Sequence, residues 1–85
     1  MALNELKKEV AKFEKKVGFD KTKSSELLKM LQKELTILKK AKNKKVKDHQ
    51  LIDIQVLLLQ LANRYKTNLN LEWKKQWNKK QKYKK

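Results

Sequence analysis

The chain has 85 residues, 39% hydrophobic and 39% charged, and 24 Lys and Arg against 9 Asp and Glu give it a formal net charge of +15. The absence of cysteine excludes disulfide frameworks, thiol catalysts and thiolate metal sites, and the absence of proline beside a single glycine disfavours sheets, whose turns depend on these residues. We therefore expect one all-α domain over residues 1–85.

The first predicted helix covers residues 3–17. Its buried face is predicted from apolar residues that recur three and four positions apart, namely Leu6, Val10, Phe13 and Val17. Gly18 predicts the C-terminal end of this helix, with Phe19 as an apolar anchor behind it. In the polar turn that follows, Thr22 and Ser24 are the candidate N-caps of the next helix.

The second predicted helix covers residues 25–41 and forms an antiparallel hairpin with the third, joined near residues 43–46. Its core stripe is Leu27, Leu31, Leu35 and Leu38, widened by Leu28, Met30 and Ile37. A basic stretch follows at residues 39–47, part of which complements the helix dipole. It is the secondary basic patch of the chain, made of Lys39, Lys40, Lys42, Lys44, Lys45 and Lys47.

The third predicted helix, residues 47–65, is the most apolar. One stripe consists of Leu51, Ile54, Leu58, Leu61 and Tyr65, and a second of Ile52, Val56, Leu59 and Ala62. Between them lies a thinner polar row of Gln50, Asp53, Gln60 and Arg64, broken by Leu57. A helix with two apolar faces belongs in the middle of a bundle. Because short neighbours cannot cover both faces, we also expect a homo-oligomer, a dimer in the first instance.

The fourth predicted helix follows Asn68, its candidate N-cap, and carries Leu69, Trp73 and Trp77 four residues apart. At this spacing, tryptophans indicate a core or an interface in preference to base stacking. A basic extension, residues 79–85, contains Tyr83 as an exposed aromatic candidate, although its lysines also fit a solvated tail. The candidate phosphate-binding residues are Lys74, Asn78, Lys79, Lys80, Lys82, Lys84 and Lys85.

The net charge favours a polyanionic partner, because such an excess destabilises a compact state by self-repulsion. We expect the partner to be RNA or DNA, and an anionic membrane surface is disfavoured. The alternative explanation of the charge is a genome that favours Lys codons. Arg64 is the only arginine, so the contacts should go to phosphates and not to base edges. No signal-like or bilayer-spanning apolar run is visible, and we expect a cytoplasmic protein.

Two segments resemble the MazG-like family of all-α nucleoside triphosphate pyrophosphohydrolases. Residues 13–30, FEKKVGFDKTKSSELLKM, are similar to the opening of that family, and residues 51–68, LIDIQVLLLQLANRYKTN, to its third helix. Lys74, Asn78 and Tyr83 match the Lys-x-x-x-Asn and basic-Tyr ending. The resemblance implies a four-helix MazG-like bundle with a central third helix, assembled as an oligomer.

The resemblance also implies a Mg²⁺ site made of Glu-x-x-Glu and Glu-x-x-Asp pairs. In this chain Glu34 and Asp53 are kept, but Ile37 and Gln50 stand where acids are expected. Isoleucine cannot ligate a metal, and Mg²⁺ requires charged oxygen donors. We therefore expect a degenerate site. Glu34 could instead pair with a lysine on its own helix, and Asp53 with Lys33 or Arg64.

Two functions follow. The first is a non-catalytic protein that binds RNA or DNA phosphates on a degenerate MazG-like scaffold, with no cofactor. The alternative is a divergent Mg²⁺-dependent pyrophosphohydrolase with a nucleotide ligand, built on Glu34, Asp53 and a partner subunit. The single histidine, His49, offers no nucleophile pair without cysteine, and we expect it to be solvated.

Overall fold

The structure is a computed structural model and describes residues 2–81. Within these residues the chain forms four helices and no strand. The helices are α1 (Leu3–Val17), α2 (Ser24–Lys40), α3 (Lys44–Arg64) and α4 (Leu69–Gln81). The all-α prediction is therefore confirmed for residues 2–81. Four residues of the predicted basic extension lie outside the described range: Lys82, Tyr83, Lys84 and Lys85.

The ends of α1 and α2 show where local signals act. Gly18 ends α1 as predicted, with a φ of 81° in the left-handed region that a residue without Cβ adopts easily. The predicted caps of α2 are wrong. Lys23 is the N-cap residue and makes no side-chain cap, so neither Thr22 nor Ser24 fills this role.

Asparagine side chains cap the N-termini of α3 and α4. Asn43 accepts a hydrogen bond from the backbone N–H of Val46 at 2.9 Å, so α3 starts at Lys44, earlier than the predicted residue 47. The connection of the hairpin is accordingly shorter, residues 41–43. Asn68 accepts from the N–H of Leu71 at 3.1 Å, which confirms it as the cap of α4.

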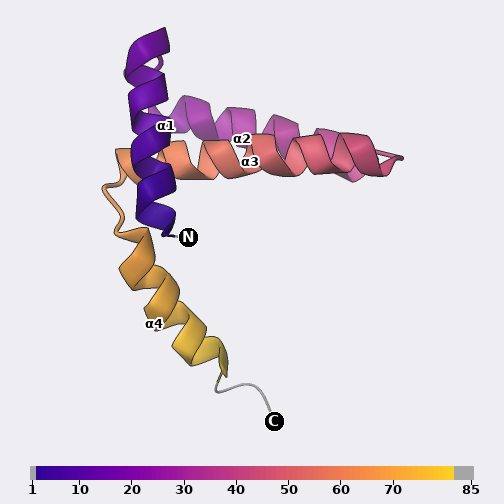
Figure 1. Cartoon of the computed structure of the whole chain (residues 1–85). Coiled ribbons are helices and arrows are strands. Elements are labelled where there is room, and N and C mark those ends of the chain that lie inside the picture. The colour runs from indigo at the N-terminus through magenta and orange to yellow at the C-terminus, as the bar shows by residue number, and fades with distance from the viewer. Residues whose placement is uncertain (1, 82–85) are drawn as a thin grey trace.

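Helices α2 and α3 form an antiparallel hairpin and pack more closely than any other pair (Figure 1). Helix α1 crosses the open end of this hairpin and packs on α3, so α3 contacts two neighbours. Helix α4 contacts α1 and then extends away from the hairpin (Figure 1). The arrangement is three packed helices with a projecting arm.

The centre of the core is Leu27 of α2 with Leu57 and Leu61 of α3, joined by the partly buried Leu31. Ile54, Leu59 and Ala62 are also buried. Leu57, which interrupts the predicted polar row, lies at the centre of this core.

Much of each predicted apolar stripe is exposed, so these predictions are wrong in part. The exposed members are Phe13, Val17, Leu28, Met30, Leu35, Ile37, Leu51, Ile52, Leu58 and Tyr65. The anchor Phe19 and the two tryptophans are exposed as well. The physical reason lies in the packing: the buried side of α3 includes Gln50 and Gln60 of the polar row beside part of each apolar stripe, so the rest of each stripe lies outside.

None of the helices in residues 2–81 is both long and apolar enough to cross a membrane.

Candidate functional site

A charged side chain lies at the centre of the contact between α1 and α3. Glu14 of α1 is 1% exposed, and its Oε1 accepts a hydrogen bond from Nη1 of Arg64 at 3.0 Å. Nη2 of Arg64 reaches Oε2 of the same carboxylate, so the guanidinium binds it with two nitrogens. Gln60 donates its Nε2 to Oε2 at 3.0 Å. Both oxygens of Glu14 therefore have a partner, which a buried carboxylate requires.

The same arginine also holds the turn between α1 and α2. Its Nε donates to the carbonyl of Thr22 at 2.8 Å and Nη2 donates to the carbonyl of Phe19 at 2.9 Å. The hydrogen bonds to Glu14 raise the pKa of Arg64 despite its partial burial, and the charges of Glu14 and Asp20 add to the rise. The guanidinium therefore keeps its proton.

This junction explains why position 64 holds an arginine and not a lysine. Only the planar guanidinium can bind one carboxylate with two nitrogens and still reach two carbonyls. Sequence reasoning missed Glu14. A usable signal was present, because Glu14 follows Val10 by four residues on the predicted apolar face of α1. Its charge on that face required a buried partner. The junction is structural and carries no chemistry of its own.

The acid positions of the resembled family are brought together only in part. Gln50 is buried on α3, and its Nε2 donates to the Oε2 of Glu34 and, at 3.3 Å, to the carbonyl oxygen of Glu34. Glu34 is therefore bound across the hairpin by Gln50. The predicted pairing of Glu34 with a lysine on its own helix is wrong.

Asp53 lies elsewhere on α3 and pairs along its own helix. Its Oδ2 lies 3.1 Å from Nε2 of His49, and their side chains are 41% and 73% exposed. The predicted pairing of Asp53 with Lys33 or Arg64 is wrong, because Arg64 is bound to Glu14. The large exposure of His49 agrees with a solvated histidine.

These residues do not fit a Mg²⁺ site. Among residues 2–81, no group of three or more His, Cys, Asp or Glu side chains is placed to hold a metal ion. Glu34 is bonded to an amide, Ile37 is an exposed hydrocarbon, and Asp53 is bonded to an imidazole. Magnesium requires several charged or carbonyl oxygens in near-octahedral geometry.

The candidate phosphate-binding residues are exposed wherever the structure describes them. On α4 these are Lys74, Asn78, Lys79 and Lys80, and Lys75, which was not a predicted candidate, is exposed as well. The secondary patch lies at the closed end of the hairpin and is exposed at Lys39, Lys40, Lys42, Lys44, Lys45 and Lys47. One of these, Lys44, is paired with Asp48 at 2.7 Å. The two basic surfaces lie at different ends of the molecule (Figure 1).

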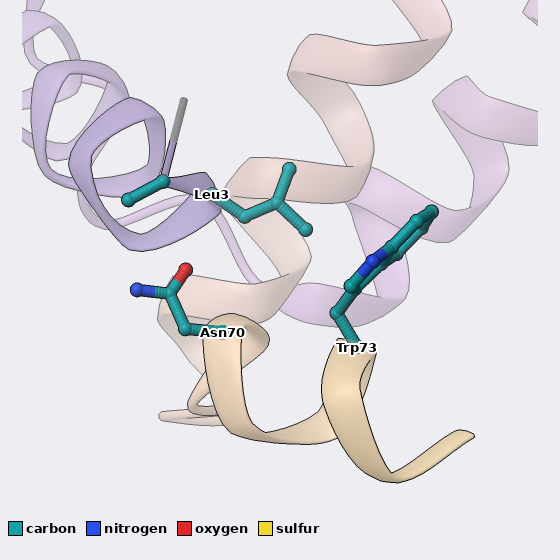
Figure 2. Close-up of a pocket in the computed structure, with 4 residues that line it drawn as sticks. Leu3, Asn70 and Trp73 are labelled. Atoms are coloured by element: carbon teal, nitrogen blue, oxygen red, sulfur yellow. The ribbon is translucent and has the colours of Figure 1, made fainter. Parts of the chain in front are cut away.

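Sequence reasoning did not foresee a hollow between α1 and α4. It has a volume of about 410 Å³ and is lined by Ala2, Leu3, Asn70 and Trp73. Figure 2 shows the Trp73 ring standing up from α4 and Leu3 extending from the first turn of α1. Trp73 and Trp77 were predicted to lie in a core or interface. A core position is wrong for the described part of the chain, where they are 60% and 48% exposed, and an interface position stays a prediction.

Comparison of this chain with protein-family models, with curated proteins and with solved structures finds no match.

Proposed function

We propose that this protein binds polyanions without catalysing a reaction, through the phosphates of RNA or DNA. The observation that carries the proposal is α4. Within residues 69–81 no side chain is buried, and the helix projects from the packed hairpin (Figure 1). It offers Lys74, Lys75, Lys79 and Lys80 against a single acid, Glu72, which lies 4.0 Å from Nζ of Lys75. Exposed lysines neutralise phosphates and release counterions.

The hairpin tip, residues 39–47, is a second surface for the same ligand. It contains no acid, and the first turn of α3 contains none either. Lysines at a helix N-terminus oppose the helix dipole, which costs stability unless an anion binds there. The tip therefore supports the proposal independently of α4.

We further propose that the scaffold is a degenerate one of MazG-like type. The hairpin α2–α3, the turn after Gly18 and the cap at Asn68 agree with the segments that carry the resemblance. Helix α4 departs from a bundle, because its main neighbour is α1 and not α3.

Self-association is part of the same proposal. Leu28 and Leu35 lie seven residues apart on α2, and Leu51 and Leu58 lie seven residues apart on α3; all four are exposed. Apolar stripes of this kind favour an interface over free contact with water. We expect a dimer by analytical ultracentrifugation, and a monomer after the double change Leu51→Ser and Leu58→Ser.

The binding test is a salt titration. Anisotropy of a labelled RNA and of a DNA of the same sequence is measured from about 50 to 200 mM salt, and affinity should fall by roughly 10³-fold or more if about six phosphates are contacted. An affinity that does not change with salt contradicts phosphate binding, as does a strong preference for one duplex sequence.

Two matched variants locate the binding surface. One carries Lys74→Gln, Lys75→Gln, Lys79→Gln and Lys80→Gln, and the other removes the same charge through Lys39→Gln, Lys40→Gln, Lys42→Gln and Lys45→Gln. The α4 variant should have a shallower slope of the logarithm of the binding constant against the logarithm of the salt concentration. The slope should decrease by roughly 0.7–0.9 for each phosphate that the protein no longer neutralises. The hairpin variant should retain most of the affinity. The reverse result moves the main site to the hairpin tip.

The alternative is a divergent Mg²⁺-dependent pyrophosphohydrolase. The observation in its favour is that positions 34 and 50 meet across the hairpin. It is tested by incubating the protein with nucleoside triphosphates and Mg²⁺ or Mn²⁺. Pyrophosphate release that disappears in Asp53→Ala establishes the enzyme and rejects the non-catalytic proposal.

A further inference from the structure

The chain's two tryptophans form one stacked pair on the projecting helix. The ring centroids of Trp73 and Trp77 are 5.6 Å apart and the rings are tilted by 7°. Both remain largely exposed, and no residue of α4 is buried. In a stacked pair each ring covers one face of the other ring. The two outer faces therefore remain open to another planar group, such as a base.

The hollow beside Trp73 extends this aromatic surface. Its volume, about 410 Å³, lies within the range of roughly 300–1,000 Å³ typical of small-molecule sites. Trp73 and Leu3 supply apolar walls and Asn70 supplies an amide (Figure 2). Asn70 Oδ1 accepts the backbone N–H of Asn4 at 3.0 Å, which holds the amide in place. A planar aromatic ring with polar edges matches these walls.

Hydrogen bonds between α1 and the start of α4 hold this surface in shape. Asn4 donates its Nδ2 to Oδ1 of Asn68 at 2.9 Å and accepts the N–H of Leu69 at 2.9 Å. The ammonium group of Lys7 donates to the carbonyl of Thr67 at 2.5 Å. The aromatic surface is therefore formed before a ligand arrives, which lowers the entropy cost of binding.

Cationic groups lie beside the rings. Asn70, Trp73, Trp77 and Lys80 follow one another at spacings of three, four and three residues, so they share one face of α4. This face is roughly 15 Å long at about 1.5 Å per residue. Lys74 is three residues from Trp77 and borders the same face. Two stacked rings with ammonium groups beside them match stacked bases joined by phosphates.

We propose that this face of α4, with the hollow at its start, binds unpaired bases of single-stranded nucleic acid by stacking on Trp73 and Trp77. The inference rests on the proposed phosphate binding and adds a preference for single strands, because the base faces of a duplex are already stacked. A second copy of the chain is a poorer occupant. Two lysine-rich α4 helices would repel each other, and the proposed dimer uses the exposed leucines of α2 and α3 instead.

The experiment uses the intrinsic fluorescence of the full chain, since both tryptophans lie in the proposed site. The protein is titrated with a mixed-sequence single-stranded DNA, with the duplex of the same sequence, and with heparin, a polyanion without bases. We expect quenching by the single strand and an affinity at least about tenfold above that for the duplex.

The variants separate stacking from charge. Trp73→Leu with Trp77→Leu should lower single-strand affinity, measured by anisotropy, at least about tenfold and leave heparin affinity unchanged. Trp73→Phe with Trp77→Phe should restore part of the affinity, because phenylalanine keeps a flat ring. Phe13→Leu is the control: Phe13 is an exposed aromatic on α1, and its replacement should change nothing.

Several results overturn the inference. Equal affinity for single strand and duplex, or an unchanged affinity in the leucine variant, rejects stacking while phosphate binding stands. No binding to any of the three polyanions rejects the proposed function, and the inference falls with it. A change in sedimentation in the leucine variant shows that the tryptophans contact a second copy, which also rejects the inference.

Discussion

Helices α1 and α4 are attached to the molecule in opposite ways. Helix α1 packs on α3 around a buried carboxylate, Glu14, whereas α4 carries Leu69, Leu71, Trp73 and Trp77 and buries none of them. Helix α1 is also the more hydrophobic of the two, since Leu3, Leu6, Val10, Phe13 and Val17 lie on it. The difference teaches that α1 joins the core through apolar residues together with a matched buried polar group, whereas α4 supplies no such group.

The largest effect should come from breaking the junction of α1. Glu14→Ala leaves the guanidinium of Arg64 partly buried without its carboxylate, and we expect the free energy of unfolding to fall by about 3–5 kcal/mol. Urea denaturation measures this decrease. Glu5→Ala, which removes an exposed acid of α1, is the matched control and should change little. A decrease below about 1 kcal/mol in Glu14→Ala would show that apolar packing holds α1.

A second effect concerns the hydrogen bond across the hairpin. Gln50→Glu replaces an amide donor with a carboxylate facing Glu34, and we expect the free energy of unfolding to fall by about 1–3 kcal/mol. Gln50→Met removes the hydrogen bond without adding charge and should cost less. Stabilisation of the unsubstituted protein by Mg²⁺ would contradict the degenerate site.

Two substitutions at helix ends should change the free energy of unfolding by smaller amounts and in opposite directions. Gly18 ends α1 with a φ of 81°, and Lys66 adopts a φ of 54° in the connection to α4. Gly18→Ala should cost about 1 kcal/mol, although its Cβ would meet nothing within 4 Å. Lys66→Gly should stabilise by about 0.5–1 kcal/mol, because the left-handed region disfavours a side chain. Thermal unfolding measures the Tm of both variants. A change of Tm in the same direction in both would contradict the prediction.

The smallest effect should come from α4. Trp73→Ala with Trp77→Ala should lower the free energy of unfolding by less than about 1 kcal/mol, because both rings are exposed. Leu27→Ala, at a site 1% exposed, should cost about 2–5 kcal/mol in the same assay. If the tryptophan variant were destabilised as much as the leucine variant, the rings would be part of a core or interface.

The candidate site was predictable to different degrees at its several positions. Exposure of the α4 lysines followed from their number in one helix, whereas the degenerate acid set inferred from Ile37 and Gln50 stays a prediction. The pairing of Gln50 with Glu34 and that of Asp53 with His49 did not follow. Each depends on the register between two helices, or on the rotation of one, which side-chain spacing leaves undetermined.

The sequence by itself determined the helical class, the hairpin and two of the helix ends. Gly18 and Asn68 act through backbone conformation and hydrogen bonds within a few residues, so local chemistry was sufficient. Only the tertiary structure decided which face of each helix is inside. Leu35 and Leu58 were predicted to be buried and are exposed, while Glu14 and Gln60 are buried. A buried carboxylate is stable only where another helix supplies its donors, and that condition is met only once α1 and α3 pack together.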